Sequence, residues 1–223
     1  MNGGMRRIII VGAGGQGAIV ADALQRARDA GAAEVATGFV DDLEPRWGTE
    51  VLGLPVLGPL RMLPSLEHDA IVVAVGDNAA RRELTSRLLA AGERLATARH
   101  PFTSVAPSAT IGAGSMLSAG AVILPRAVIG RGVIVNTRAS VDHDSVVGDF
   151  AHVSAGALVG AECRVGDEAL IAVGATVASR MRVGARATIG AGAVVVRHVP
   201  DGVRALGVPA RVTSGPRSET TSP

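Results

Sequence analysis

The chain carries two hydrophobic patterns, and the stronger one fills its second half. From Val105 to Val195 an Ile, Leu or Val recurs every six residues, sixteen times in succession. Four residues after each of these positions comes a second series of mostly small residues, which begins at Ala109 and includes Cys163. Helices and strands produce periods of 3.6 and 2 residues, so a period of six indicates a repeated structural unit.

This hexapeptide period resembles that of the left-handed parallel β-helix in the hexapeptide-repeat acyltransferases. In that fold three hexads form one triangular coil, with the aliphatic side chains stacked inside and small residues at the corners. Sixteen hexads therefore predict about five coils, and the register fails at Asp201. Residues 199–212 resemble the closing strand of the family, with Gly207 to Arg211 in the position of its G-x-P-A-[KR] motif, and the resemblance also implies a homotrimer.

The first half of the chain has the pattern of a small α/β domain. Residues 6–27 predict a buried strand, a Gly-rich turn and a helix. Residues 35–42 predict a second strand, and residues 70–92 a third strand with another helix, which together favour a small parallel sheet. We therefore predict a Rossmann-like domain over residues 1–100, which the family resemblance described below makes nucleotide-sugar-binding, a β-helix over residues 101–212 and a disordered tail over residues 213–223.

The Gly-rich turn fits more than one kind of site. Gly12, Gly14 and Gly17 match the Gly-x-Gly-x-x-Gly fingerprint of dinucleotide sites, and Asp41 lies near the position of a ribose-binding acid. A dehydrogenase is disfavoured, because the α/β pattern ends near residue 100 and a β-helix follows it. The turn itself requires only an anion near a helix N-terminus, which a nucleotide-sugar diphosphate supplies as well as NAD does. A nucleotide-sugar site, a purely structural turn and a dinucleotide site all stay open at this point.

Composition and charge narrow the class of partner. The net charge is +2 and every basic residue is a scattered Arg, which does not indicate a nucleic-acid groove. The single Cys163 excludes an intramolecular disulfide and suits a reducing cytoplasm. The apolar run from Ile8 to Val11 is too short to span a membrane, so no membrane insertion is expected.

The segment VDHDSV, residues 141–146, departs from the small-residue monotony of the repeat. Val141 holds an inward position, so His143 is predicted to project from the prism rather than to lie in its core. A neutral imidazole, with a pKa of about 6.5, accepts a proton at neutral pH, and a carboxylate beside it fixes its tautomer. The alternative is a solvated surface histidine among acids, and Asp142 is interpreted as solvated charge. Cys163 takes a small inward position and is predicted to pack rather than to react.

The order of the parts is more specific than either half. A Gly-rich α/β domain precedes a β-helix that carries the pattern N-T-x-x-x-V-x-H-[DE]-x-x-[IV]-G-[DE]-F-x-H from Asn136 to His152. This order resembles the sugar O-/N-acyltransferase family, which includes sialic acid O-acetyltransferases and N-acetyltransferases of UDP-linked 4-amino sugars. The resemblance covers roughly residues 5–212.

Carried over position by position, the resemblance makes His143 the general base and Asp144 the acid that orients it. It places His152 near the acyl-CoA and has Gly160 donate its backbone N–H to the thioester carbonyl. The residues that it assigns to the nucleotide sugar belong to the Gly-rich turn and the end of the second strand: Gly12, Gly14, Gly17, Gln16, Asp41 and Asp42.

Two positions depart from the family pattern. Gln16 stands where many members have His, which puts that residue's contact with the sugar in doubt. Asp144 is shorter than the Glu often found at its position, so its carboxylate must reach the imidazole from a different backbone placement.

The resemblance implies an acetyl-CoA-dependent N-acetyltransferase that acts on a nucleotide-linked amino sugar, with its active site between adjacent subunits. Acetyl-CoA is then a co-substrate, and no metal is expected. O-acetylation of a sialic acid or related sugar is the first alternative, since an amine and a hydroxyl need the same base. The others are a trimeric zinc enzyme of the carbonic anhydrase type, for which a third outward His is missing near His143 and His152, and a non-catalytic nucleotide-binding scaffold.

Overall fold

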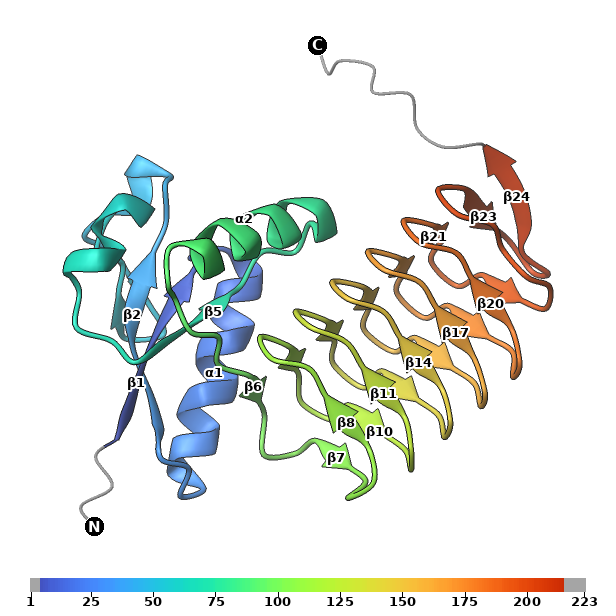
Figure 1. The fold of residues 1–223 in the computed structure, drawn as a ribbon, viewed down its shortest axis with the longest axis horizontal. Coiled ribbons are helices and arrows are strands. Elements are labelled where there is room, and N and C mark those ends of the chain that lie inside the picture. The colour runs from blue at the N-terminus through green and yellow to red at the C-terminus, as the bar shows by residue number, and fades with distance from the viewer. Residues whose placement is uncertain (1–4, 215–223) are drawn as a thin grey trace.

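A computed structural model describes residues 5–214, which form an α/β domain followed by a long three-sided prism (Figure 1). The α/β domain contains a parallel sheet in the order β2-β1-β5, so the first strand lies in the middle. Its strands and long helices are β1 (Arg6–Val11), α1 (Gly15–Asp29), β2 (Glu34–Val40), β5 (Ala70–Val73) and α2 (Asn78–Ala90). Shorter elements connect β2 to β5: η1 (Glu44–Arg46), β3 (Glu50–Val51), β4 (Leu54–Pro55) and η2 (Leu60–Ser65).

The central strand β1 is buried on both of its faces. Ile8 and Ile10 pack into a core with residues of α1, whereas Ile9 and Val11 pack into a second core with residues of η2 and α2. A strand covered on both sides reads as a continuous apolar run, which explains why RRIIIV has no alternation. The predicted small parallel sheet is confirmed.

The prism is a left-handed parallel β-helix built from two-residue strands, as the six-residue period predicts. Strands of successive coils pair in parallel on each of three sides, at a spacing of three hexads. Face 1 contains β7 (Ser104–Val105), β10 (Val122–Ile123), β13 (Ser140–Val141), β16 (Leu158–Val159), β19 (Thr176–Val177) and β22 (Val194–Val195). Face 2 contains β8 (Thr110–Ile111), β11 (Val128–Ile129), β14 (Val146–Val147), β17 (Arg164–Val165) and β20 (Arg182–Val183).

Face 3 is longer than the other two because both ends of the prism extend it. It contains β6 (Ala98–Arg99), β9 (Met116–Leu117), β12 (Ile134–Val135), β15 (His152–Val153), β18 (Leu170–Ile171), β21 (Thr188–Ile189), β23 (Arg204–Leu206) and β24 (Arg211–Ser214). The first of these strands continues directly from the α/β domain, and the last pairs antiparallel with β23. The sheet on face 3 is therefore closed at both ends by strands outside the hexapeptide series.

The interior of the prism is filled by the two predicted series of residues. Val141 and Ser145 are both fully buried, and so is Cys163. The Cys163 thiol donates to the Ala178 carbonyl at 3.1 Å, and its burial raises the pKa of the thiol. A buried protonated thiol is a packing residue rather than a nucleophile, which is the interpretation that the sequence favoured.

The expected number of coils is wrong by one. Face 1 has six strands, all within the hexapeptide series, and the sixth coil that begins at β22 is completed by residues after Val195. In this last coil Ile189 pairs with Ala205, whereas the full spacing of three hexads would have brought Gly207 to that place. Val199 forms the bridge to Val183 on face 2, so Asp201 lies in the following turn instead of the interior. The last coil is thus shortened at one corner without breaking the stack.

β24 reaches into the segment predicted as a tail. Thr213 and Ser214 belong to this strand, and the rest of that segment, residues 215–223, lies outside the described residues. Within residues 5–214 no helix has both the length and the hydrophobicity needed to cross a membrane.

The α/β domain is fastened to face 3 of the prism. Met116 and Ile134 point outward from β9 and β12, yet both are fully buried because they join the core beside α1. At the corner between faces 2 and 3, Arg81 of α2 is fully buried and donates hydrogen bonds to the carbonyls of Gly132 and Phe150, at 2.8 and 2.7 Å. The domain orientation is therefore fixed by a packed apolar contact and by a buried cation.

Candidate functional site

His143 lies at the corner between faces 1 and 2, in the turn that joins β13 to β14. Its side chain is 46% exposed, and its Nδ1 lies 2.7 Å from Oδ2 of Asp144. Because an ionised carboxylate can only accept, Nδ1 carries the proton, and Nε2 of the neutral ring keeps its lone pair. This is the tautomer that a general base requires.

Asp144 makes this contact from a left-handed backbone conformation, with φ at 60°. Asp is one of the few residues other than Gly that adopt this region readily. In this prism the corresponding corner residue of many coils is left-handed, so the conformation belongs to the coil and not only to this site. A short acid reaches the imidazole of the preceding residue from this placement.

Arg126, one coil earlier at the same corner, binds the same carboxylate. Its Nε and Nη2 atoms lie 2.6 and 2.7 Å from Oδ1 and Oδ2 of Asp144, a bidentate pair. The hydrogen bonds from Arg126 and then from His143 hold the pKa of Asp144 far below its ordinary value, so it is ionised. The corner therefore contains a connected series of Arg126, Asp144 and His143.

Asp142 does more than carry solvated charge. Its Oδ1 accepts the backbone N–H of His143 at 2.7 Å and lies 4.0 Å from Nε2 of the same residue. The side chain therefore fixes the turn from which His143 projects.

Gly160 lies at the same corner, one coil after Asp142, but its amide is already used. The Gly160 N–H donates to the Val177 carbonyl at 2.9 Å, as part of the ladder between β16 and β19. The expectation that this N–H polarises a thioester carbonyl therefore has no free donor to support it. The next amide, that of Ala161, makes only a 3.2 Å bond to the hydroxyl of Ser179.

His152 lies on face 3, in β15, and not at the corner that holds His143. Burial, and then the charge of Arg81, lower the pKa of His152 to about 4, although the Gly76 carbonyl partly offsets them. Asn136 is its neighbour, with Nδ2 3.4 Å from Nε2 of the ring. His152 is therefore a neutral histidine under the α/β domain.

The Gly-rich turn connects β1 to α1, and two of its glycines are required by the backbone. Gly12 has φ of 102°, and a Cβ atom on Gly17 would collide with the Gly12 carbonyl. Gly14 is the N-cap of α1 in an extended conformation, where a Cβ atom would meet only the guanidinium of Arg46. No side chain caps α1 and its first turn has no acid, so its N-terminal N–H groups and its dipole favour an anion.

Asp41 at the end of β2 holds this turn in place. Its Oδ2 accepts the Ala13 N–H at 2.7 Å and the Arg46 guanidinium at 2.6 Å, and its Oδ1 accepts the Leu43 N–H. Burial raises the pKa of Asp41, but these hydrogen bonds outweigh it and bring the pKa below its usual value. Asp41 therefore orders the loop and brings the Arg46 cation over the Gly-rich turn.

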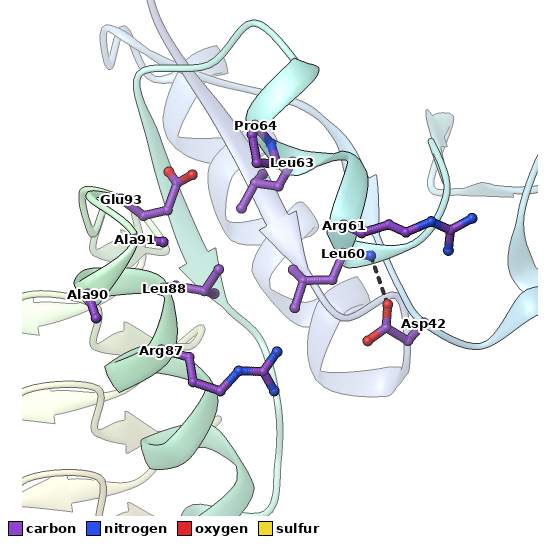
Figure 2. Close-up of a pocket in the computed structure, with 10 residues that line it drawn as sticks. All are labelled: Asp42, Leu60, Arg61, Leu63, Pro64, Arg87, Leu88, Ala90, Ala91 and Glu93. Carbon is purple, nitrogen blue, oxygen red and sulfur yellow. Dashed lines mark hydrogen bonds between the residues drawn. The ribbon is translucent and has the colours of Figure 1, made fainter.

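Asp42 points to a different place, so the two acids do not form one pair facing a ligand. Its Oδ1 accepts the Leu60 N–H at 2.8 Å, at the start of η2. It lies at one end of a groove between η2 and α2, whose volume is about 580 Å³. Figure 2 shows the residues that line this groove. The expectation of a joint contact by Asp41 and Asp42 is not supported, because their carboxylates diverge.

Gln16 lies in the first turn of α1 and faces the prism. Its Nε2 lies 3.6 Å from Sδ of Met116 on face 3. The residue therefore lies between the Gly-rich turn and the prism, on the same side as His152.

The candidate residues thus form two separate groups in one chain. His143, Asp144 and Gly160 lie at the corner between faces 1 and 2. The Gly-rich turn, Gln16 and His152 belong to the side of face 3, which the α/β domain covers. In a three-sided prism a corner lies opposite the third face, so the prism itself separates the two groups.

Within residues 5–214 of the single chain, no three His, Cys, Asp or Glu side chains gather as metal ligands do. The zinc alternative needs three such ligands at one point.

Comparison with known proteins agrees with both halves of the chain. Residues 7–88 match the family model of the PglD N-terminal domain. Among curated protein sequences, none matches the chain significantly.

Solved structures cover nearly the whole chain. PerB from Caulobacter crescentus, in complex with CoA and GDP-perosamine, is 35% identical with a TM-score of 0.87, over 96% of this chain and 99% of that one. The chain belongs to the hexapeptide-repeat sugar acyltransferases. The acetyltransferase domain of PglB from Neisseria gonorrhoeae with acetyl coenzyme A is 40% identical, with a TM-score of 0.85 over 94% and 100% of the two chains. WeeI from Acinetobacter baumannii is 29% identical, with a TM-score of 0.82 over 92% and 99%.

Sequence reasoning on this sugar acyltransferase missed three arginines. Arg46 binds Asp41, and Arg126 binds Asp144. Arg81 forms hydrogen bonds across the interface between the domains. The spacing of Arg126 and Asp144 by three hexads was a usable signal, because residues at that spacing are stacked in this fold. The contacts of Arg46 and Arg81 depend on how a loop and a domain pack, and the sequence has no period that predicts them.

Proposed function

We propose that this sugar acyltransferase transfers the acetyl group of acetyl-CoA to the amino group of a nucleotide-linked amino sugar. The observation that carries the proposal is the His143–Asp144 contact at an exposed corner, which leaves Nε2 as a proton acceptor. The structurally similar PerB was solved with CoA and GDP-perosamine, and the PglB domain with acetyl coenzyme A, which supports an amino-sugar acceptor over a hydroxyl.

In this mechanism His143 acts as general base. Nε2 removes a proton from the attacking amine, the new C–N bond forms at the thioester carbonyl, and the thiolate of CoA leaves with the C–S bond pair. Asp144 keeps the proton on Nδ1 and stabilises the imidazolium that forms. Protonation of the thiolate by this imidazolium returns His143 to its neutral form.

The nucleotide part of the acceptor belongs, on this proposal, at the Gly-rich turn. The uncapped N-terminus of α1 and the Arg46 cation beside Gly14 offer two features that favour a diphosphate. Asp41 would act through the loop that it orders, because its carboxylate already accepts hydrogen bonds from Ala13, Leu43 and Arg46.

We further propose that each active site forms between two copies of the chain, in a homotrimer. The separation of His143 from the Gly-rich turn supports this, since the body of the prism lies between the two groups of one chain. A second copy can bring its own corner to the face-3 side of the first, and the same contact repeated three times closes a ring. Such a protein is suited to the cytoplasm, where its one cysteine stays reduced.

The chemistry is tested by thiol release from acetyl-CoA with a panel of GDP-, UDP- and dTDP-linked 4-amino sugars and their hydroxyl counterparts. At least one amino sugar should be acetylated, and His143→Ala should lower kcat by about 10²–10⁴ without changing thermal stability. Turnover by His143→Ala at the wild-type rate would rule out this base, and acetylation of hydroxyl sugars alone would replace the N-transfer by O-transfer.

The shared site is tested by mixing two inactive variants. Gly14→Asp should fold, because Asp is a favoured N-cap, but its charge should exclude a diphosphate from α1. Gly14→Asn is the matched control that caps the helix without the charge. Subunit exchange between Gly14→Asp and His143→Ala should restore about a quarter of the activity if sites lie between chains of a closed ring. A site within one chain would show no recovery.

A further inference from the structure

One corner of the prism carries a column of charged residues that the catalytic pair only partly uses. Arg126, Asp144, Glu162 and Arg180 follow one another at intervals of three hexads, with φ values of 61, 60, 57 and 64°. Because each coil repeats the same backbone conformation, these four side chains leave the corner from equivalent positions, about 4.8 Å apart from coil to coil.

The column divides into two ion pairs of unequal quality. Arg126 binds Asp144 through two parallel hydrogen bonds of 2.6 and 2.7 Å. Arg180 binds Glu162 through one contact of 3.3 Å. Glu162 thus pairs with the arginine of the following coil. Asp144, the acid beside His143, pairs with Arg126 of the preceding coil.

The two hydrogen bonds of Arg126 leave one direction open on the carboxylate. Oδ1 of Asp144 accepts Nε of Arg126, while Oδ2 accepts both Nη2 of Arg126 and Nδ1 of His143. Asp144 is 36% exposed, and alone it would rotate freely about its two side-chain bonds. The planar guanidinium fixes the plane of the carboxylate, and the remaining lone pair of Oδ2 then meets the imidazole.

We infer that Arg126 is a positioning residue for the acetyl transfer. It orients the Asp144 carboxylate toward His143, and its positive charge offsets that carboxylate, so the base works at a lower pH than a simple His–Asp pair would. The inference rests on the proposed function of His143.

The charged groups around His143 support a specific role for Arg126. On its own corner the imidazole faces Asp142 and Asp144, and the preceding coil contributes Arg126. The following coil contributes Glu162, whose backbone N–H donates to the His143 carbonyl and whose side chain pairs with Arg180. Among these groups, Arg126 is the cation bonded to the carboxylate that holds the imidazole.

The test is the pH dependence of kcat/KM in Arg126→Gln, Arg126→Lys and wild type. Removal of the charge stabilises the imidazolium, so the acid limb of Arg126→Gln should move up by about half to one pH unit, with roughly tenfold lower kcat. Arg126→Lys keeps the charge but not the planar fork, so its acid limb should return toward the wild-type position while kcat stays reduced.

Arg180→Gln is the matched control. It removes an ion pair from the same corner and the same backbone conformation, but not one whose side chains bond to the His143 imidazole or to Asp144. Its acid limb should coincide with that of wild type. An unshifted Arg126→Gln profile, or an equal shift in Arg180→Gln, would overturn the inference.

Two measurements separate this inference from the proposed function. If His143→Ala is inactive and Arg126→Gln is like wild type, only the role of Arg126 fails; if His143→Ala is fully active, the base itself is wrong. An NMR titration of the His143 ring, assigned with His143→Ala, needs no substrate. An upward shift of its midpoint in Arg126→Gln supports the inference, and an unchanged midpoint overturns it.

Discussion

Two histidines, one at a corner and one on a face, show how differently the two sides of the prism treat the same side chain. His143 leaves a corner, is 46% exposed at its side chain and is bonded to an ionised acid. His152 leaves face 3, lies under the α/β domain beside the buried cation Arg81, and has a pKa lowered to about 4. One histidine is therefore suited to exchange protons, and the other to stay neutral.

The contrast comes from where each side chain finds its hydrogen-bond partners. A corner side chain finds its partners one coil away and shares them with water, so its replacement costs the fold little. A group at the face-3 interface has lost its water, and every polar atom there depends on a particular partner in the other domain. Changes at the corner should therefore alter chemistry, and changes at the interface should alter stability.

The largest expected effect at the interface belongs to Arg81. Arg81→Met should lower the free energy of unfolding by about 3–5 kcal/mol, because it leaves the prism carbonyls of Gly132 and Phe150, and that of Val75 in the α/β domain, without this donor. Thermal or urea unfolding measures this loss. Arg87→Met, an exposed position on the same helix, is the control and should change stability by less than about 0.5 kcal/mol. If both variants are equally stable, the claim that contacts at the face-3 interface control stability is wrong.

The second effect is a dependence of stability on pH at His152. Its folded pKa of about 4 lies below the unfolded value of about 6.5, so the unfolded chain binds the proton more tightly. This contribution to stability is complete above pH 6.5 and is lost as the pH falls toward 4, by about 3 kcal/mol in total. Unfolding of wild type and His152→Asn between pH 7 and 4 isolates it, since other acids contribute to both. If the stabilities of the two proteins depend on pH in the same way, His152 is solvated in the folded protein, as His143 is.

The smallest expected effect concerns Asp142 at the corner. Asp142→Asn should keep the hydrogen bond from the His143 N–H, because its amide oxygen can still accept. We therefore expect kcat/KM to change by less than about threefold, without loss of stability. Steady-state kinetics decide this, and a hundredfold loss would show that the carboxylate 4.0 Å from Nε2 takes part in the chemistry.

The prism was predictable because its period states which residues are neighbours. Val141 inside, His143 outside and Cys163 packed in the core all follow from the six-residue phase, as does the small α/β sheet from its apolar runs. The coil count was short by one, because the sixth coil is shorter than three hexads and no longer obeys the period. A pattern can predict a repeat, but not the point at which local packing takes over from it.

In the site, only the outward position of His143 followed from the six-residue phase, and the other roles were expected from the family resemblance. The contact of His143 with Asp144 agrees with the predicted arrangement, whereas the Gly160 amide proved to be used by the ladder between coils. Asp41 and Asp42 are adjacent in sequence, yet their carboxylates point to different places. That of Asp41 accepts a hydrogen bond from the Gly-rich turn, and that of Asp42 accepts one from the start of η2. Contacts in the α/β domain join residues with no fixed spacing, so their partners emerge only in three dimensions.

The closing strands at the two ends of face 3 also determine what the prism cannot become. The last coil of a stack of identical coils exposes unpaired backbone N–H and C=O groups. Another chain could pair with them, so the stack could grow end to end into a fibre. Here β6 ties one edge to a globular domain, and β24 covers the other by running antiparallel to β23. The shortened last coil adds a mismatch that an incoming coil of full length would not fit. The same repeat that could polymerise without limit is thereby held to one defined length.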